Sequence, residues 1–477
     1  MIERKTILKR LILRNFRRFE EITLDLDEKL TLLVAENGGG KTAMLDGIAL
    51  ALWDFEKDVL GHQHHGFEEW DIRRAPSRDG AMVPMLPVTL DATGSIYGHT
   101  GSWRWELGSV KGRTKHSDAQ PATKAAEEIT YDLGKYATER SRIAPVLPVI
   151  RYFGTGRLWL PNRLTQGKKE AAKDLTVQVE TYRNCLSSSS SYREFEVWFE
   201  SVVREAQNEQ ASKVASPHKP QGKLAAVRQA VGRVLGPSGW NGLDWDFLTS
   251  AVVAVHDDNG RLPVSWLSDG IRNLIALVGD LAYRAVRLNP HFGADACLNS
   301  PGVVMIDEVD MHLHPSWQQQ VVGLLRSAFP EIQFILTSHS PQVISTVPRE
   351  CVRVLAGNEW RMPPQQTRGV ESAELLAEVM GVDPIPDVEQ SRWVKDYQQM
   401  IELNQDETDE GVALREKIIA HFGLQHPVVL DCDRLKRWQR HSWTCRVSAA
   451  PTVNPQSTPA KAISSISGER TKGISPS

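Results

Sequence analysis

A short glycine-rich segment, set between an apolar strand and an apolar helix, constrains the fold of this chain more than any other feature. The run from Leu30 to Val34 predicts a buried strand, and Ala35-Glu36-Asn37-Gly38-Gly39-Gly40-Lys41-Thr42 follows it directly. Residues 42–53 then place apolar side chains on one helical face. Strand, glycine loop and helix in this order are the context that a phosphate-binding loop requires.

The residues of this loop suit nucleotide phosphates. Glycines let successive backbone N–H groups point inward at phosphate oxygens. The Lys41 ammonium can reach the β- and γ-phosphates, the Thr42 hydroxyl can ligate Mg²⁺, and the helix start adds its positive dipole end. Ala35 stands where the general pattern has glycine. We expect ATP and Mg²⁺ to be bound here by Asn37, Gly38, Gly39, Gly40, Lys41 and Thr42.

Two adjacent carboxylates end a second apolar strand. The run from Val303 to Ile306 is followed by Asp307 and Glu308, which would lie beside the phosphate loop. Asp307 can hold Mg²⁺ through water, and Glu308 can polarise the attacking water as a general base. Asp310 then begins a turn into a helix expected over residues 316–329. The alternative is a strand that ends in two solvated acids.

A histidine follows a third strand. The run from Gln333 to Leu336 predicts a buried strand, and Thr337-Ser338-His339-Ser340 comes directly after it. A histidine at a strand tip beside the γ-phosphate can donate a hydrogen bond to the phosphate or to the attacking water. A lone histidine is more often structural. Because His339 follows the acidic pair by about thirty residues, we expect it to be catalytic.

The segment Ser265-Trp266-Leu267-Ser268-Asp269-Gly270-Ile271-Arg272 points to a site shared between copies of the chain. A serine and a glycine at a helix start can bind a γ-phosphate through the hydroxyl and backbone N–H groups. Within one ATPase head this helix would lie too far from its own phosphate loop, so the serine must act on the nucleotide of a second head. We expect Ser268, Asp269 and Gly270 to bind nucleotide across a homodimer or a higher homo-oligomer.

Together these residues resemble the ABC-type heads of the RecF, SMC and OLD class, and more closely the PtuA ATPases of Septu and retron anti-phage systems. The class begins with a strand similar to Leu13-Arg14-Asn15-Phe16-Arg17-Arg18-Phe19, in which Arg17 or Arg18 would face the nucleotide. The resemblance covers residues 5–440. Further matching stretches are Tyr152-Phe153-Gly154-Thr155-Gly156-Arg157-Leu158-Trp159, Leu267-Ser268-Asp269-Gly270-Ile271-Arg272-Asn273, Ile306-Asp307-Glu308-Val309-Asp310-Met311-His312-Leu313-His314-Pro315, Gly369-Val370-Glu371-Ser372 and Gly381-Val382-Asp383-Pro384-Ile385-Pro386-Asp387.

The resemblance implies a regulatory ATPase that acts on a partner. In that family the partner is an HNH nuclease of the PtuB type, joined in retron systems by a reverse transcriptase with its RNA-linked DNA. Engagement of two ATP-bound heads would restrain or release the nuclease. The implied fold is α/β: an ABC-type P-loop ATPase head with a mixed sheet, a large inserted α-rich region and a helical C-terminal module.

Composition indicates the class of protein, and changes of pattern along the chain predict its divisions. A net charge of −3 gives no global basic field for nucleic acid. Scattered cysteines favour a reducing cytoplasm, and no apolar run reaches the length of a membrane span. The expected divisions are 1–55 and 251–370 for the two parts of the head, 56–250 for the insertion, 371–440 for the helical module and 441–477 for a disordered tail.

Two other functions fit parts of the sequence. An OLD-type ATPase-nuclease would carry a Toprim domain, for which Val428-Val429-Leu430-Asp431-Cys432-Asp433 offers an Asp-x-Asp, although no upstream strand ends in the glutamate that such a domain needs. A DNA-repair ATPase would need a basic groove, although a solvated basic face is the commoner explanation of such residues. The candidates for that groove are Arg4, Lys5, Lys9, Arg10 and Arg14. Weaker candidates are a metal at His62, His64 and His65 or at His312 and His314, and a phosphate or partner contact at Arg157.

Overall fold

The computed structural model describes residues 4–61, 66–139, 144–156, 177–188, 192–212 and 219–448, with the side chains of 139 and 441–448 left aside. The chain divides into two compact units, and the boundary falls between Pro384 and Ile385. None of the helices described has the length and apolar character that crossing a bilayer would require.

A six-stranded mixed sheet forms the centre of the larger unit. Its strand order is β16-β15-β3-β14-β13-β9, and neighbouring strands are parallel except for the edge pair of β15 and β16. Strands β3, β14, β13 and β9 are buried along their whole length, as expected for parallel strands covered on both faces. The bounds are β3 Leu30–Val34, β9 Val149–Phe153, β13 Gly302–Ile306, β14 Ile332–Ser338, β15 Val352–Ala356 and β16 Glu359–Arg361.

Three antiparallel sheets complete the β-structure described for the larger unit. The largest has the order β2-β1-β6-β7-β8, and β6 alternates buried and half-buried residues because one face packs on the core. Its bounds are β1 Ile7–Phe16, β2 Phe19–Asp25, β6 Val88–Ile96, β7 His99–Leu107 and β8 Lys115–Ser117. The smaller sheets are β10 Trp240–Asp246, β11 Ala251–His256 and β12 Gly260–Pro263, and the pair β4 Arg74–Pro76 and β5 Met82–Pro84.

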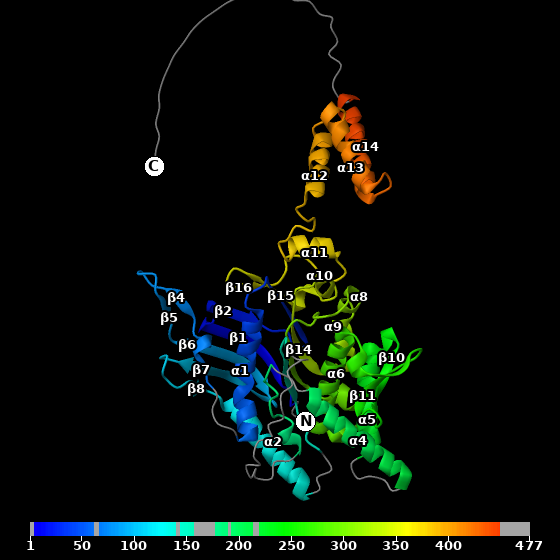
Figure 1. Cartoon of the computed structure of the whole chain (residues 1–477). Helices are drawn as coiled ribbons and strands as arrows, with labels where there is room; N and C mark the ends of the chain where they lie inside the picture. Colours follow the sequence, from blue (N-terminus) through cyan, green and yellow to red (C-terminus); the bar gives the residue numbers. More distant parts are fainter. Residues whose placement is uncertain are drawn as a thin grey trace, which may run out of the picture. The chain divides into compact units, whose positions relative to one another are not determined.

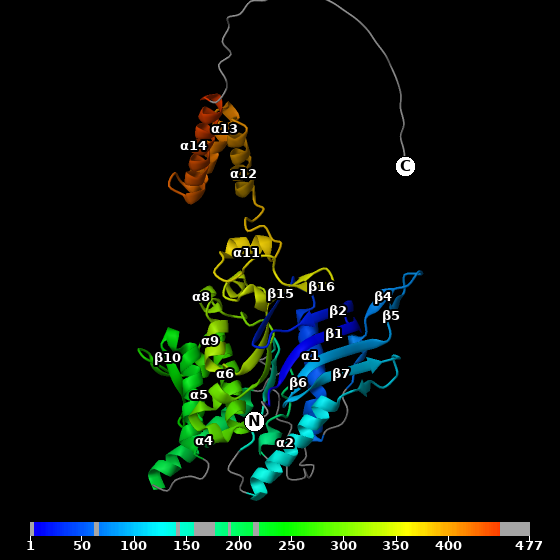
Figure 2. The same cartoon turned by 180° about the vertical axis from the view of Figure 1, so that it is seen from behind.

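Helices cover the six-stranded sheet on both faces. Helix α1 contacts β14 on one side and β1 and β6 of the five-stranded sheet on the other. Figures 1 and 2 show α4, α5, α6 and α9 on the side of the sheet away from α1. The bounds are α1 Lys41–Leu60, α2 Gln120–Glu139, α3 Val177–Glu180, α4 Tyr192–Ser212, α5 Pro220–Leu235, α6 Asp269–Leu288, α7 Ala296–Asn299, α8 Pro315–Gln318, α9 Val321–Ala328, α10 Pro341–Ile344 and α11 Ser372–Glu378.

A buried glutamine joins the two main sheets. Gln333 lies on β14, and its side chain accepts a hydrogen bond from the Leu8 N–H at 2.9 Å and donates to the carbonyls of Leu8 and Asp27, both at 2.8 Å. Leu8 lies beside a register shift in the pairing of β1 with β6. Gln333 therefore satisfies backbone groups at an irregular point of the strand, where an unpaired buried group would be costly.

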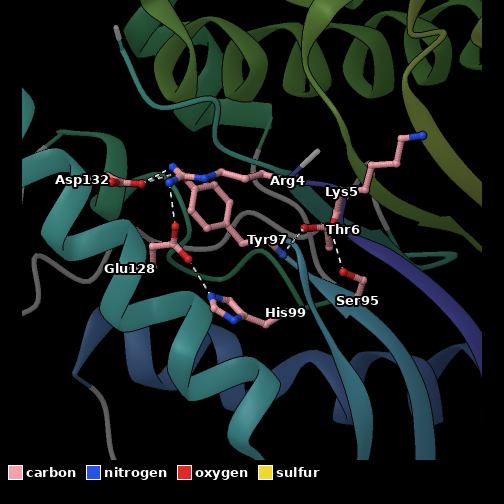
Figure 3. A network of polar contacts seen from close by, with 8 residues as sticks. All are labelled: Arg4, Lys5, Thr6, Ser95, Tyr97, His99, Glu128 and Asp132. Atoms are coloured by element: carbon pink, nitrogen blue, oxygen red, sulfur yellow. Dashed lines mark hydrogen bonds and ion pairs between the residues drawn. The ribbon is translucent and has the colours of Figure 1, made fainter. Parts of the chain in front are cut away.

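A polar network fixes the start of the chain to the β6–β7 hairpin and to α2 (Figure 3). Arg4 donates to the Tyr97 hydroxyl at 2.7 Å and forms ion pairs with Glu128, at 2.6 Å, and with Asp132. Glu128 also pairs with the His99 ring at 2.6 Å. Burial raises the pKa of the Tyr97 hydroxyl, so this group stays neutral and can donate to Asp132 at 3.0 Å. The charge of Arg4 is thus paired with carboxylates of the same chain.

A buried charge cluster ties helix α6 to strand β9. Arg151 on β9 donates to Asp280 on α6 at 2.8 Å, and Arg284 donates to the same carboxylate oxygen at 3.2 Å. The three side chains are almost completely buried. Burial alone would raise the pKa of Asp280, but the guanidinium groups of Arg284 and Arg151 outweigh it and hold that pKa below its usual range. Asp280 is therefore ionised, and it is the counter-ion of both arginines.

The smaller unit is a bundle of three helices, α12 Glu389–Glu402, α13 Asp409–Phe422 and α14 Pro427–Ser448. Its core is formed by Tyr397, Ile401, Ile418, Val429 and Cys432. The α/β fold with a mixed sheet and a helical C-terminal region, expected from the sequence, is confirmed.

The boundaries within that fold differ from the expected ones. The region 56–250 supplies β6 and β7 to the sheet of β1, and β9 to the six-stranded sheet, so it is interleaved with the head. At the other end, Leu375 of α11 is buried in the core of the larger unit, and the smaller unit starts at Ile385 rather than at 371. Helix α14 continues through 441–448, and residues 449–477 of the expected tail lie outside the described residues.

We expect Asp280→Asn to destabilise the protein strongly, because it leaves two buried guanidinium groups without their counter-ion. Breaking a buried pair in this way costs about 3–5 kcal/mol of unfolding free energy. Urea unfolding followed by tryptophan fluorescence measures the loss. The matched control is Glu200→Gln, which breaks the exposed pair with Arg204 and should change the unfolding free energy by less than about 1 kcal/mol. Equal effects of the two changes would contradict the structural role of the cluster.

Candidate functional site

Three neighbouring parallel strands end at one edge of the six-stranded sheet and carry the predicted motifs. Val34 of β3 pairs with Ser338 of β14, and Ile306 of β13 pairs with Leu336 of β14. The glycine loop, the acidic pair and the histidine segment each begin where one of these strands ends. The crevice at the carboxyl ends of parallel strands is where α/β folds bind ligands.

The backbone of the loop is shaped for close approach by a ligand. Gly40 is the N-cap of α1 and has φ 99°, which favours glycine. A side chain there would also collide with the Phe19 ring, since an added Cβ would lie 2.3 Å from it. Helix α1 thus begins at Lys41, with its first N–H groups at the loop.

The side chain of Lys41 contacts the backbone of its own loop. Its ammonium donates to the carbonyl oxygens of Ala35 at 2.9 Å and Glu36 at 3.3 Å, and it lies 2.5 Å from Nε2 of His339. Burial lowers the pKa of Lys41, whereas the carboxylates of Asp307, Glu308 and Asp310 act to raise it. A buried cation close to three carboxylates, at the end of a glycine loop, is suited to an anionic ligand with a bound metal ion.

A chain of hydrogen bonds links the loop to the acidic pair. The Thr42 hydroxyl donates to one oxygen of Asp307 at 2.7 Å, and the Thr337 hydroxyl donates to the other oxygen at 2.6 Å. The Glu308 N–H donates to the Thr337 hydroxyl at 2.7 Å. Glu308 has φ 49°, an unusual value for a residue with a side chain. Thr337 therefore holds both the carboxylate of Asp307 and the backbone that aims Glu308.

His339 is held in its neutral form by its surroundings. Burial, followed by the nearby Lys41 ammonium, lowers the pKa of its ring, against the opposing effect of Asp310, Glu308 and Asp307. In contact with Lys41 the Nε2 atom is then an acceptor, which places the ring proton on Nδ1. Of the residues named as catalytic in the sequence analysis, the structure brings Glu308 and His339 to the same edge as Lys41.

The predicted signature segment is placed on the outside of the same unit. Ser268 is the N-cap of α6, and both Ser268 and Asp269 are exposed. Gly270 approaches the 308–314 turn closely, and a Cβ there would lie 2.6 Å from the His312 carbonyl oxygen. The side chain of Asn273 donates to the Met311 carbonyl at 3.2 Å. The start of α6 thus packs on the turn that follows Glu308, which gives Gly270 a structural role within the chain.

The expectation that Arg17 or Arg18 faces the nucleotide stays a prediction, and the two arginines have different partners. Its guanidinium forms ion pairs with Asp46, at 2.5 Å, and with Asp71, at 3.0 Å. Arg18, the neighbouring residue, instead donates to the carbonyl of Gly38 in the loop and is exposed. The pattern of the sequence could not distinguish the two, because the choice depends on partners far along the chain. Because it contacts the loop, Arg18 is better placed than Arg17 to face a nucleotide bound there.

The weaker expectations concern metal binding by histidines and a contact of Arg157. Residues 62–65, with the three histidines, and Arg157 lie outside the described residues. In the ranges that the structure describes, no cluster of three or more His, Cys, Asp or Glu side chains could hold a metal ion, and this includes the surroundings of His312 and His314.

Two family models match the chain. One is described as "AAA domain, putative AbiEii toxin, Type IV TA system" and matches residues 155–345, and the other is described as "AAA domain" and matches residues 10–217. The second includes the glycine loop, and the first includes the signature segment, the acidic pair and His339. Both family models thus contain residues of the edge described above.

Curated proteins are similar to parts of this chain. The "Retron Ec83 probable ATPase" of Escherichia coli is 33% identical over 170 residues, which are 35% of this chain and 31% of that protein. The "Retron Vc95 probable ATPase" of Vibrio cholerae serotype O1 biovar El Tor is 36% identical over 162 residues, 32% of this chain and 31% of that protein. The "Septu protein PtuA" of Bacillus mycoides (strain KBAB4) is 37% identical over 130 residues, 26% of this chain and 17% of that protein.

The chain is a relative of the PtuA and retron ATPases. Its glycine loop joins the parallel strand β3 to helix α1, and the two matched family models are both described as AAA domains. The matched part spans about a third or less of the length of these relatives.

Solved structures with similar architecture are SMC heads. The "SMC head domain from Thermotoga maritima" is 15% identical, with a TM-score of 0.39, and the match covers 73% of this chain and 95% of that one. The SmcHead bound to the C-winged helix domain of ScpA is 13% identical, with a TM-score of 0.44, over 75% of this chain and 97% of that one. The fold rests on the strand order given above.

Thr337 is a functional candidate that sequence reasoning did not assign. The signal was available, since a hydroxyl residue ends a buried strand beside the one that ends in Asp307. We expect Thr337→Val to lower the rate of ATP hydrolysis about ten- to a hundredfold, because the lost hydrogen bonds free Asp307 and Glu308. Thr337→Ser, which keeps the hydroxyl, should restore most of the rate.

The measurements are steady-state hydrolysis as a function of Mg²⁺ concentration and equilibrium binding of ATP. A positioning role raises the Mg²⁺ requirement of Thr337→Val while ATP affinity changes little. If Thr337→Val and Thr337→Ser lose the same fraction of the hydrolysis rate, the site tolerates no change at this position. The loss would then not be explained by the hydroxyl.

Proposed function

We propose that this protein is an ATP-binding and ATP-hydrolysing regulatory subunit of an anti-phage defence complex. The observation that supports it most is the edge at which Lys41, Thr42, Asp307, Glu308 and His339 meet. These residues come from three neighbouring strand ends, and their contacts match the tasks of binding phosphates, holding a metal ion and activating water.

The donor set fits ATP with Mg²⁺. The Thr42 hydroxyl and the Asp307 carboxylate are hard oxygen donors that lie 2.7 Å apart and would hold Mg²⁺, which prefers one or two protein ligands together with substrate phosphates. Bound there, the ion would neutralise charge on the phosphates. Asn37, Gly38 and Gly39 would contribute loop backbone to the phosphates, and Lys41 would exchange its loop carbonyls for phosphate oxygens.

Glu308 would act as general base. Its backbone, with φ 49°, is held by the hydrogen bond from the Glu308 N–H to the Thr337 hydroxyl. His339, neutral and beside Lys41, would orient the attacking water or the γ-phosphate. Each role belongs to a residue that already lies at the edge, so catalysis needs only the nucleotide, the metal and a stabilising group from outside.

That outside group would be the signature segment of a second copy. Ser268 and Asp269 are exposed at the start of α6, and the Ser268 hydroxyl makes no capping hydrogen bond to its own helix. Facing a second head, the hydroxyl and the first N–H groups of α6 would contact the γ-phosphate held by the opposite Lys41. The active form would then be a homodimer with two composite sites.

The names of the relatives support the defence role, and the resemblance to PtuA implies the partner. Proteins named as a Septu protein and as a retron ATPase are 37% and 33% identical to this chain over 130 and 170 residues. We propose that ATP-dependent engagement of two heads controls an HNH nuclease subunit of the PtuB type, with a reverse transcriptase and its RNA-linked DNA in a retron setting. A pull-down from cells that express the neighbouring genes tests the partner directly.

The rival functions have less support. The basic residues near the start of the chain pair with acids: Arg10 with Asp25 at 2.5 Å, Arg14 with Glu21 at 2.9 Å, and Lys9 with Glu28 at 3.6 Å. Ion pairs across the strands reduce the field that a DNA groove needs. The Asp-x-Asp of an OLD-type nuclease would have to end a strand, but Asp431 lies within helix α14.

We expect Lys41→Ala to abolish ATP binding, because it removes the cation that would neutralise the β- and γ-phosphates. Isothermal titration with Mg²⁺-ATP measures the loss. The matched control is Lys29→Ala, an exposed lysine paired with Glu331, which should bind as the unchanged protein does. Undiminished affinity in Lys41→Ala would place the nucleotide elsewhere.

We expect Glu308→Gln to bind ATP, to lose hydrolysis and to accumulate as an ATP-dependent dimer. Sedimentation with and without Mg²⁺-ATP measures the dimer. Adding Ser268→Ala should abolish it, whereas Ser265→Ala, an exposed serine of the same segment, should not. A Glu308→Gln protein that hydrolyses ATP at the original rate excludes Glu308 as the base, and one that stays monomeric excludes the composite site.

A further inference from the structure

A strained turn connects β1 to β2. Its two residues are Arg17 and Arg18, and Phe16 pairs with Phe19 across it. Arg17 has φ 51°, whereas in a two-residue hairpin turn a positive φ at the first position favours glycine. A side chain held in this conformation costs free energy, and such strain persists where the surrounding contacts compensate for it. The partners of the Arg17 side chain are therefore informative.

The same turn lies against the phosphate loop. The Arg18 side chain donates to the carbonyl of Gly38. The Phe19 ring and the stem of Arg18 both approach Gly40, where an added Cβ would lie 2.3 Å from the ring and 3.0 Å from the stem. The glycines that would bind phosphates are thus packed against this turn, so a shift of the turn would change the shape of the loop.

The side chain of Arg17 bonds the turn to two other segments. Its Nη1 atom pairs with Asp46 at 2.5 Å, and Asp46 lies about one helical turn after Thr42 on α1. Its Nε atom pairs with Asp71 at 3.0 Å, and the Arg17 N–H donates to the Asp71 carbonyl at 2.7 Å. A planar guanidinium can bind two carboxylates in fixed directions, which the single ammonium of a lysine cannot do.

We propose that Arg17 is a positioning residue for nucleotide binding, which acts through Asp46 and the turn and makes no contact with the nucleotide. The inference rests on the proposed ATP site and adds how its loop is held in shape. The Arg17 side chain is only 27% exposed, and its charge is already shared between two carboxylates. A cation paired in this way attracts phosphates less than an unpaired one. Its effect on the nucleotide would instead be carried by Arg18 and Phe19, which contact the loop.

The decisive variant is Arg17→Lys in the full chain, because it keeps the positive charge but cannot pair with both carboxylates. Isothermal titration with Mg²⁺-ATP measures the affinity, and steady-state hydrolysis gives KM and kcat. We expect Arg17→Lys to weaken ATP binding about tenfold, nearly as much as Arg17→Ala, and to raise KM more than it lowers kcat. The matched control is Arg14→Lys, an exposed arginine of β1 paired with Glu21, which should bind ATP as the unchanged protein does.

A double-mutant cycle separates positioning from direct contact. If Arg17 acts through Asp46, the variant with both Arg17→Ala and Asp46→Ala loses no more ATP affinity than Arg17→Ala alone. Asp46 also accepts a hydrogen bond from the Tyr152 hydroxyl at 2.9 Å, so Tyr152→Phe is the control that leaves the pair with Arg17 in place, and it should change the affinity by less than about twofold. Urea unfolding of each variant keeps a loss of folded protein from being read as a loss of affinity.

Two results would overturn the proposal and leave the ATP site standing. One is unchanged affinity in Arg17→Lys, which would mean that the charge alone is sufficient. The other is a loss in Arg17→Ala that Asp46→Ala does not share, which would indicate a direct contact of Arg17 with the nucleotide. Full ATP affinity in Lys41→Ala would instead remove the site itself, and this proposal with it.

Discussion

The carboxylate of Asp307 is the group on which the rest of the site depends. It is 1% exposed, and a buried carboxylate is stable only with hydrogen bonds to both oxygens. Thr42 from the loop and Thr337 from the neighbouring strand supply them. Thr42 and Asp307 are separated by 265 residues, so the site exists only once the six-stranded sheet has formed. In this way the register of the sheet, rather than any single loop, determines where the phosphates and the metal ion would bind.

The sequence predicted those parts of the site in which the functional residues directly follow an apolar strand. The glycine loop, the acidic pair and His339 each follow an apolar run, and parallel pairing brings such ends together. Strand β9 could not be predicted in this way, because Arg151 lies at the centre of its five residues and breaks the apolar pattern. Only the position of Asp280, on a helix more than a hundred residues later, shows why an arginine is stable there. The ion pairs of Arg17 could not be predicted for the same reason, since Asp46 and Asp71 lie far from it in the sequence.

Charge is arranged differently in the two main layers of the head. On the five-stranded sheet, Arg10 and Arg14 meet acids on the adjacent strand at the surface, where such pairs contribute little stability and mainly cancel charge. Between β9 and α6, the pair of Arg151 with Asp280 is removed from water and fixes one helix to one strand. The first arrangement pairs these basic residues with acids, which reduces the positive field that binding to a nucleic-acid backbone needs. The second gives the signature helix a defined position relative to the sheet.

The close approach of Gly270 to the carbonyl of His312 has a consequence for a two-headed assembly. The start of α6 would serve one nucleotide, while the turn after Glu308 belongs to the other, and within one chain these segments are packed without room for a methyl group. A displacement at either segment must therefore be shared by its neighbour. In the proposed homodimer the two sites would therefore be linked: occupancy of one would change the affinity of the other, equally in both directions. The missing side chain of a single glycine would thus make the assembly cooperative.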